Sequence, residues 1–429
     1  MTYKDTLDYL YARLPMFQRV GPMAFKKDLT NIKAILEALG NPERYFKSIH
    51  VGGTNGKGSV SHVIAGCLTK MGYKTGLYTS PHYKDIKERI KIDGQFIDED
   101  FFTDFINDNK ALIEAINPSY FELLVAMSFS YFKHEKVDFA IVEVGLGGRL
   151  DSTNVIEPLL SVITNIGYDH QAFLGDTLVQ IAGEKAGIIK RSTPVLIGER
   201  QREVEDVFIK KADNEYATLK FAEDYTRIEW EDNLDKSKGI KVIHDGNIEI
   251  NASPTDLMAN YQLKNLSTAY SALRWLGDIA DIKFTPEVFE KTIASLRKDY
   301  NFLGRFDVIQ HSPFIVLDSA HNVNGMEALL KEIDSIPYDD LHVVFGTVTD
   351  KNINPVLELL PTKGHYYFCK PDIPRGMDAD QLLEMARAHS LKGISYGSAA
   401  DAYNAAIRNA GTNDLICACG SIFVVAEVI

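Results

Sequence analysis

The feature that most constrains the fold is a repeated alternation of short, almost continuous apolar runs with longer segments of helical periodicity. The first apolar run, "SIHV", is followed by a helical pattern that stops at Gly72. Runs of this kind are typical of parallel strands that are covered by helices on both faces. We therefore predict a doubly wound α/β sheet. Its other expected strands are "KTGLYTS", "VDFAIVEVGLGG", "PLLSVITNIG" and "TPVLIG".

The pattern changes in the second half of the chain. Residues 219–252 alternate between polar and apolar side chains, with turn signals at Lys238-Gly239 and Asp245-Gly246 that predict small antiparallel hairpins. A polar stretch, "RKDYNFLGRFDV", is the expected linker, because the alternation of strands and helices restarts after it. We therefore predict a large N-terminal domain over residues 1–297 and a smaller, Rossmann-like α/β domain over residues 298–429.

Composition and charge argue against a nucleic acid or a membrane as the partner of this protein. The 429 residues carry a net charge of -13, which argues against a nucleic-acid surface, since phosphate backbones are held by clustered basic side chains. No apolar run is long enough to span a bilayer, and Asp5 and Asp8 interrupt the N-terminal segment where a signal peptide would be apolar. The four cysteines lack metal-binding spacing. We expect a cytoplasmic monomer that acts on small molecules.

A glycine-rich turn follows the first apolar run and opens the first helical segment. A strand that ends in glycines at a helix N-terminus exposes backbone N–H groups and the positive end of the helix dipole, which together bind phosphate. Lys57 adds a positive charge, and the hydroxyls of Thr54 and Ser59 add further polar groups. The spacing departs from the standard P-loop, because Gly58 separates Lys57 from Ser59. We favour a P-loop-type phosphate site over a turn of the flavin or dinucleotide folds.

Three further side chains are candidates for chemistry. Glu143 stands near the end of an apolar strand, where a carboxylate can hold Mg²⁺, or can simply cap a neighbouring helix. His170 follows the next strand, and on its own is better explained as a loop or capping residue, since Mg²⁺ prefers oxygen ligands. Lys185 lies beside Glu184, either as an exposed ion pair or as a buried amine with a lowered pKa.

Taken together, these stretches resemble the folylpolyglutamate synthase/dihydrofolate synthase family of the Mur ligase superfamily. The modified P-loop of that family reads GTNGKGS, and Gly53 to Ser59 match it letter for letter. Further matches are "LYTSPH", "ERIKIDG", "EVGLGGRLDSTN", "TNIGYDH" and "GEKAGIIK" in the first half, and "LGRFDV", "LDSAHN", "TDKN" and "CGSIFVVAEV" in the second. The resemblance therefore extends over essentially the whole chain.

The resemblance implies a role for each matching residue. Lys57, Lys185 and His321 would be catalytic, with Lys185 carried as a carbamate, and Ser80, Glu143 and His170 would hold Mg²⁺. Pro81, His82 and Phe121 would lie near the pterin ring, although Phe121 is at least as well explained as a core residue. ATP would be bound by Gly53, Thr54, Asn55, Gly56, Lys57, Gly58, Ser59 and Asn265, and across the cleft between the domains by Arg305 and Asp318.

The implied reaction is ATP-dependent formation of an amide. A folate or dihydropteroate carboxylate would attack the γ-phosphate, and the amino group of L-glutamate would then displace phosphate from the acyl phosphate. One alternative is a Mur ligase that acts on a UDP-linked peptide, but too few residues precede the loop for the additional domain of those enzymes. Another is a P-loop nucleotide switch or ATPase, which would not need the "DSAHN" cluster.

Overall fold

The fold is described from a computed structural model, in which residues 1–14, 28–232 and 238–429 are described. The chain divides into two compact units. Within the described residues the first unit ends at Phe302 and the second runs from Leu303 to Ile429. This division falls a few residues after position 297, where the sequence predicted the domain boundary.

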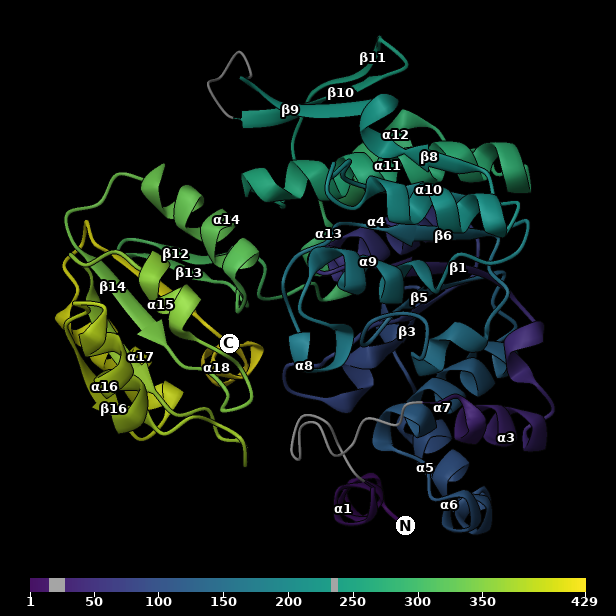
Figure 1. The fold of residues 1–429 in the computed structure, drawn as a ribbon, viewed down its shortest axis with the longest axis horizontal. Helices are drawn as coiled ribbons and strands as arrows, with labels where there is room; N and C mark the ends of the chain where they lie inside the picture. Colours follow the sequence, from purple (N-terminus) through teal and green to yellow (C-terminus); the bar gives the residue numbers. More distant parts are fainter. Residues whose placement is uncertain (15–27, 233–237) are drawn as a thin grey trace. The chain divides into compact units, whose positions relative to one another are not determined.

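The first unit is built on an eight-stranded sheet (Figure 1). Its strands lie in the order β4-β3-β2-β5-β1-β6-β7-β8, and all neighbours from β2 to β8 are parallel. The predicted parallel sheet is therefore confirmed, with an antiparallel edge formed by β3 and β4. The strands are β1 (Lys47–Gly52), β2 (Thr75–Tyr78), β3 (Ile90–Ile92), β4 (Gln95–Phe96), β5 (Phe139–Glu143), β6 (Leu160–Ile163), β7 (Val195–Ile197) and β8 (Leu219–Phe221).

Helices cover both faces of this sheet because alternate strand residues point in opposite directions. Phe139 and Ile141 of β5 pack in one core cluster with the helices after the glycine turn and near residue 270. Ala140 and Val142 of the same strand pack in a second cluster with the N-terminal helices. The first layer contains α4 (Lys57–Lys70), α11 (Asn260–Ala280), α12 (Pro286–Ile293) and α13 (Leu296–Tyr300). The opposite side contains α1 (Tyr3–Arg13), α3 (Thr30–Ala38), α5 (Glu99–Asp108), α6 (Lys110–Ile116) and α7 (Tyr120–His134), and a third cluster contains α9 (Leu178–Ala186) and α10 (Glu205–Asn214).

A separate three-stranded antiparallel sheet packs on α11 (Figure 1). The predicted turn at Asp245-Gly246 is confirmed, because it joins two paired strands. The predicted turn at Lys238-Gly239 is wrong: both residues pair with the preceding strand, opposite Asp232 and Glu231. The strands are β9 (Thr226–Asp232), β10 (Lys238–His244) and β11 (Asn247–Ser253).

The second unit is a six-stranded sheet in the order β12-β13-β17-β14-β15-β16, parallel except for its edge strand β12. The predicted linker "RKDYNFLGRFDV" contains the division between the units after Phe302, but it is too long, since its start lies in α13 and its end lies in β12. The strands are β12 (Asp307–His311), β13 (Phe314–Leu317), β14 (Leu341–Phe345), β15 (His365–Cys369), β16 (Gly393–Tyr396) and β17 (Leu415–Cys419). The helices are α14 (Val323–Asp334), α15 (Asn354–Leu359), α16 (Ala379–Ala388), α17 (Ala399–Asn409) and α18 (Ile422–Val428).

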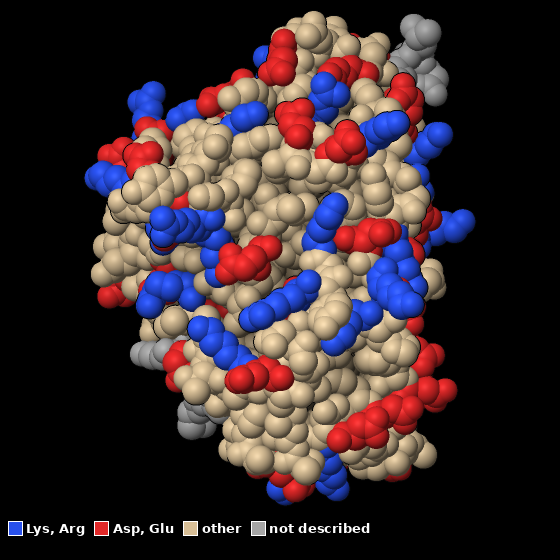
Figure 2. All heavy atoms as spheres, turned by 90° about the vertical axis from the view of Figure 1, so that its right-hand side faces the viewer, with Lys and Arg blue, Asp and Glu red and all other residues tan. Residues whose placement is uncertain are grey.

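The surface charges, the helices and the cysteines bear on the expectations from composition. The face drawn in Figure 2 carries basic side chains interspersed with acidic ones. Among the described residues, no helix has both the length and the apolar character required to cross a membrane. All four cysteines are buried free thiols.

Candidate active site

The glycine turn joins β1 to α4 and is fastened to the segment that follows β6. The backbone N–H of Thr54 donates to the carbonyl of Asn165 at 2.8 Å, and the N–H of Asn55 donates to the Asn165 side-chain oxygen at 3.0 Å. The Thr54 hydroxyl exchanges hydrogen bonds with the backbone of Gly167. The Thr164 hydroxyl donates to the carbonyl of Asn55 at 2.6 Å. The turn therefore has a defined shape.

At two positions of the turn, a side chain would be strained and crowded. Gly53 has φ +135°, and a Cβ there would lie 1.9 Å from the Thr164 hydroxyl oxygen. Gly56 has φ +83°, and a Cβ there would lie 2.1 Å from the side-chain oxygen of Asn265. The predicted nucleotide-contacting residue Asn265 thus lies directly against the turn, where its amide donates to Gln262 at 2.9 Å.

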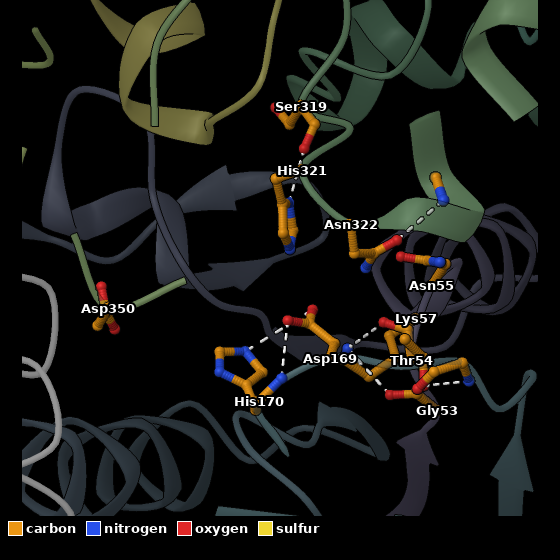
Figure 3. Close-up of polar contacts among 12 residues, drawn as sticks. Gly53, Thr54, Asn55, Lys57, Asp169, His170, Ser319, His321, Asn322 and Asp350 are labelled. Carbon is orange, nitrogen blue, oxygen red and sulfur yellow. Dashed lines mark hydrogen bonds and ion pairs between the residues drawn. The ribbon is translucent and has the colours of Figure 1, made fainter. Parts of the chain in front are cut away.

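Lys57 is the first residue of α4 and folds back over the turn (Figure 3). Its ammonium group donates to the carbonyl of Gly53 at 3.2 Å and to that of Thr54 at 3.0 Å. The turn therefore combines a positive side chain with the N-terminus of a helix, which is the arrangement that binds phosphate.

Lys185 is buried beside the same turn. It lies in α9, and its ammonium group donates to the carbonyl of Gly53 at 2.8 Å. Burial, reinforced by the nearby charge of Lys57, lowers the pKa of Lys185 to about 7, against the opposing effect of Asp169 and Asp151. A substantial fraction of this amine is therefore unprotonated at neutral pH, as expected for the buried interpretation and unlike an exposed ion pair.

Two of the expected metal ligands, Ser80 and Glu143, lie at the ends of the adjacent strands β2 and β5. Glu143 is the last residue of β5 and is buried, and its carboxylate accepts the backbone N–H of Ser80 at 3.2 Å. A Cβ on Gly58 would lie 3.8 and 3.9 Å from the two carboxylate oxygens, so Glu143 also faces the first turn of α4. The structure thus brings Ser80 and Glu143 together beside the phosphate turn.

His170 follows β6, as predicted, and precedes α8 (Gln171–Leu174) with φ +51°. Its ring lies 3.9 Å from the Asp169 carboxylate (Figure 3). The described residues contain no group of three or more His, Cys, Asp or Glu side chains that could hold a metal ion. Of the three expected Mg²⁺ ligands, only Glu143 and His170 are of these residue types, because the third is Ser80.

The expected pterin-contacting residues occupy the segment after β2 and the start of α7. Pro81 follows a cis peptide bond, and the ring of His82 accepts a hydrogen bond from the Arg89 guanidinium at 2.8 Å. Burial, with a contribution from Arg89, holds the pKa of His82 well below its usual value. Phe121 is half-buried, with its ring 6.0 Å from that of Tyr78, and it packs against the second core cluster.

The expected residues of the second unit surround the end of β13. The carboxylate of Asp318 is buried and accepts the backbone N–H groups of Phe306 and Ala320, each at 2.8 Å. His321 donates from its ring to the carbonyl of Ser319 at 2.8 Å (Figure 3). Asp318 thus fixes the backbone of the segments that carry Arg305 and His321.

Sequence reasoning missed the residues that shape the site without facing a ligand. Thr164 and Asn165 fasten the phosphate turn, and they stand in the "TNIGYDH" stretch that was selected only for its later residues. Asp151 is buried, and its carboxylate accepts the N–H of Leu146 and both the N–H and hydroxyl of Thr153. For Thr164 and Asn165, their position directly after the buried strand β6 was the available signal.

Comparison with known proteins places this geometry in a family. The Mur ligase middle domain matches residues 51–273, and the Mur ligase glutamate ligase domain matches residues 304–422. The chain is 31% identical over 436 residues to the dihydrofolate synthase/folylpolyglutamate synthase of Bacillus subtilis, a match that covers 99% of this chain and 98% of the relative. It is 32% identical over 380 residues to the Escherichia coli enzyme of the same name, covering 88% and 85%.

Solved structures agree with these matches. A complex of E. coli FolC with DHPP and ADP has a TM-score of 0.86 at 28% identity, covering 100% of this chain and 97% of that one. A Mycobacterium tuberculosis folylpolyglutamate synthase with ADP and AMPPCP has a TM-score of 0.87 at 27% identity, covering 99% and 98%. The chain therefore belongs to the folylpolyglutamate synthase/dihydrofolate synthase family of the Mur ligase superfamily.

Proposed function

We propose that this ATP-dependent amide-forming ligase joins L-glutamate to the carboxylate of a folate or of dihydropteroate through an acyl phosphate. The observation that carries the proposal is the phosphate turn itself, with Lys57, Lys185 and Glu143 gathered around it. Family membership supports the choice of acceptor, because the relatives are named as folylpolyglutamate and dihydrofolate synthases.

The residues of the chain divide the work of phosphoryl transfer. The N–H groups at the start of α4 and the ammonium group of Lys57 would bind the phosphates of ATP and stabilise the negative charge that grows during transfer. Activation is needed because a free carboxylate is a poor electrophile. The acyl phosphate that results is open to attack by the amino group of glutamate, with phosphate as the leaving group.

The residues present fit a divalent cation. Glu143 supplies a buried carboxylate beside the phosphate turn, and Ser80, whose N–H donates to it, supplies a hydroxyl. We propose Ser80, Glu143 and His170 as the Mg²⁺ ligands. The bound ion would neutralise charge on the phosphate oxygens. A related structure from Yersinia pestis contains AMPPNP and manganese, which agrees with a need for a divalent metal.

We propose that Lys185 is carbamylated in the active enzyme. Its lowered pKa supports this, because CO₂ reacts with a neutral amine and not with an ammonium ion. The modification would turn a cation 2.8 Å from the Gly53 carbonyl into a carboxylate-like group that can accept hydrogen bonds or approach the metal.

The acceptor would lie along the segment after β2. We propose that Pro81, His82 and Phe121 contact the pterin ring, with the half-buried face of Phe121 available for stacking. His82, which accepts from Arg89, can present only its remaining ring nitrogen to a ligand. In the second unit we propose Arg305, Asp318 and His321 as nucleotide contacts that exclude water from the acyl phosphate.

The test is ADP release with ATP, Mg²⁺ and L-glutamate, with dihydropteroate or tetrahydrofolate supplied in separate reactions and products identified by mass. We expect a product with each acceptor, which corresponds to a bifunctional enzyme. A product with only one would disprove bifunctionality. Turnover of ATP without any acceptor would support a nucleotide switch, and ATP binding without a product from either acceptor would favour a different Mur ligase substrate.

A further inference from the structure

A buried lysine outside the expected site lies in β3, near the antiparallel edge of the eight-stranded sheet. Lys91 is the central residue of β3 and is only 2% exposed. Its ammonium group donates to the carbonyl of Tyr300 at 2.6 Å and contacts the ring nitrogen Nε2 of His62 at 3.2 Å. Burial lowers the pKa of Lys91 to about 8, so the cation still predominates at neutral pH. Burying such a charge is unfavourable unless its hydrogen bonds are made, which suggests a specific use.

His62 contacts both Lys91 and the first turn of α4. Its Nδ1 lies 2.7 Å from the carbonyl oxygen of Gly58, which can only accept, so Nδ1 carries the proton. Nε2 is then left with a lone pair directed at Lys91, and the ammonium group is the donor. The chain of contacts therefore runs in one direction, from Lys91 through His62 to Gly58.

Gly58 is the residue at which this chain meets the site. It lies in the first turn of α4, within the predicted triphosphate loop. A Cβ added to Gly58 would lie 3.8 and 3.9 Å from the two carboxylate oxygens of Glu143, so this residue faces that carboxylate. A change in the orientation of this peptide would move both the N–H groups of the helix terminus and the surroundings of Glu143.

We propose that Lys91 and His62 are positioning residues that hold the first turn of α4 in the orientation that binds the phosphates of the nucleotide. Neither side chain has to touch the substrate, because both act through the Gly58 carbonyl. This inference rests on the proposed function of the loop, and it adds two residues that none of the expected roles includes.

The chain offers a graded test at His62. His62→Phe keeps a ring beside those of Phe302 and Tyr300, at centroid distances of 5.0 and 6.3 Å in the present protein, but removes both nitrogens. His62→Asn keeps an N–H donor near the position of Nδ1 and loses the contact with Lys91. Binding of Mg²⁺-ADP to the full chain is measured by calorimetry, and thermal unfolding is measured in parallel.

We expect His62→Phe to weaken ADP binding about three- to tenfold, the effect of losing one hydrogen bond that supports the bound state. His62→Asn should recover most of that loss, and KM for the acceptor should stay unchanged in both variants. Equal ADP affinity in His62→Phe and the unsubstituted protein would overturn the inference. The inference would also be overturned if His62→Asn bound ADP as weakly as His62→Phe and the loss of affinity in the variants paralleled their loss of melting temperature.

Lys91→Met tests the lysine itself. Methionine is of similar length but leaves the Tyr300 carbonyl and Nε2 of His62 without their donor, so some loss of melting temperature is expected. We expect ADP binding, measured well below the melting temperature, to weaken about threefold or more. An unchanged affinity would contradict the role of Lys91.

A matched control is His244→Phe, which removes another buried histidine of the first unit, one that contacts the Thr226 hydroxyl and the Tyr270 ring. It should leave ADP affinity unchanged. Failure of the unsubstituted protein to bind ADP would overturn the proposed function as well, whereas normal binding by the protein and by His62→Phe would overturn only this inference.

Discussion

At the scale of single residues, the most informative side chain is Lys185. Its burial beside Lys57 lowers the pKa of the amine to about 7, and it lies 2.8 Å from the Gly53 carbonyl. A lysine with an ordinary pKa would be almost wholly protonated at neutral pH and would react poorly with CO₂. If Lys185 is carbamylated as we propose, its chemistry should depend on pH and on dissolved CO₂.

We predict that bicarbonate raises kcat and that the gain grows as the pH rises through about 7, because deprotonation exposes the amine to CO₂. The measurement is the rate of ADP release at saturating substrates, between about pH 6 and about pH 8, in degassed buffer with and without added bicarbonate. Mass spectrometry under native conditions should detect the added CO₂.

Lys190→Met is a suitable control for this prediction. Lys190 is another lysine with a pKa lowered by burial, and it donates to the carbonyl of Asn154 at 2.8 Å. Its replacement should leave the bicarbonate response intact, whereas Lys185→Met should abolish it. A bicarbonate response that survives in Lys185→Met would show that the modified group is elsewhere.

The sequence revealed the candidate ligand-binding residues better than the residues that hold the phosphate turn in shape. Glu143 could be selected because a charged side chain at the end of an apolar strand is conspicuous, and Lys185 because it stands in a stretch that matches the family. Asn165 and Thr164 could not, because their importance comes from bonds to Thr54 and Asn55, more than a hundred positions away in the chain. Such long-range contacts exist only once the strands are placed side by side.

At the scale of elements, the join between β1 and α4 depends on the backbone of Gly56. Its φ of +83° is uncommon for other residues, and an added Cβ would lie 2.1 Å from Asn265. We predict that Gly56→Ala weakens ADP binding tenfold or more and destabilises the protein by about 1–3 kcal/mol, measured by calorimetry and thermal unfolding.

Gly72→Ala separates strain from function. Gly72 has φ +91° at the other end of the same helix, with nothing within 4 Å of an added Cβ. This variant should lose about 1 kcal/mol of stability through backbone strain alone and should bind ADP normally. Equal weakening of ADP binding in both variants would mean that the position of Gly56 has no special role.

Elements were predictable where burial was strong. The buried strands β5, β6 and β7 were evident because their runs are almost wholly apolar. The edge strands β12 and β16 were missed because their residues are largely exposed or half-buried, so no apolar pattern distinguishes them from loops. The turn at Lys238-Gly239 was misplaced because a glycine within a strand gives the same signal as a turn.

At the scale of the whole molecule, the two units have separate sheets and cores, yet both are matched along the chain by domains of one ligase family. Fold class and family could be predicted from the sequence because the motifs are specific in combination. The exact boundary could not, since α13 and β12 occupy the stretch whose polar composition suggested a linker.

The last prediction concerns the contribution of the second unit to catalysis. Arg305→Ala and His321→Ala should each lower kcat about ten- to a hundredfold, as expected for loss of a group that stabilises transferring phosphate, with little change in melting temperature. Asp318→Asn should lower the melting temperature in addition to kcat, because the buried carboxylate that we propose as a nucleotide contact also accepts two backbone N–H groups. Arg408→Ala, at an exposed site on α17, controls for charge and should change neither quantity. If Arg305→Ala and His321→Ala retain full kcat at saturating ATP, phosphoryl transfer depends on the first unit alone.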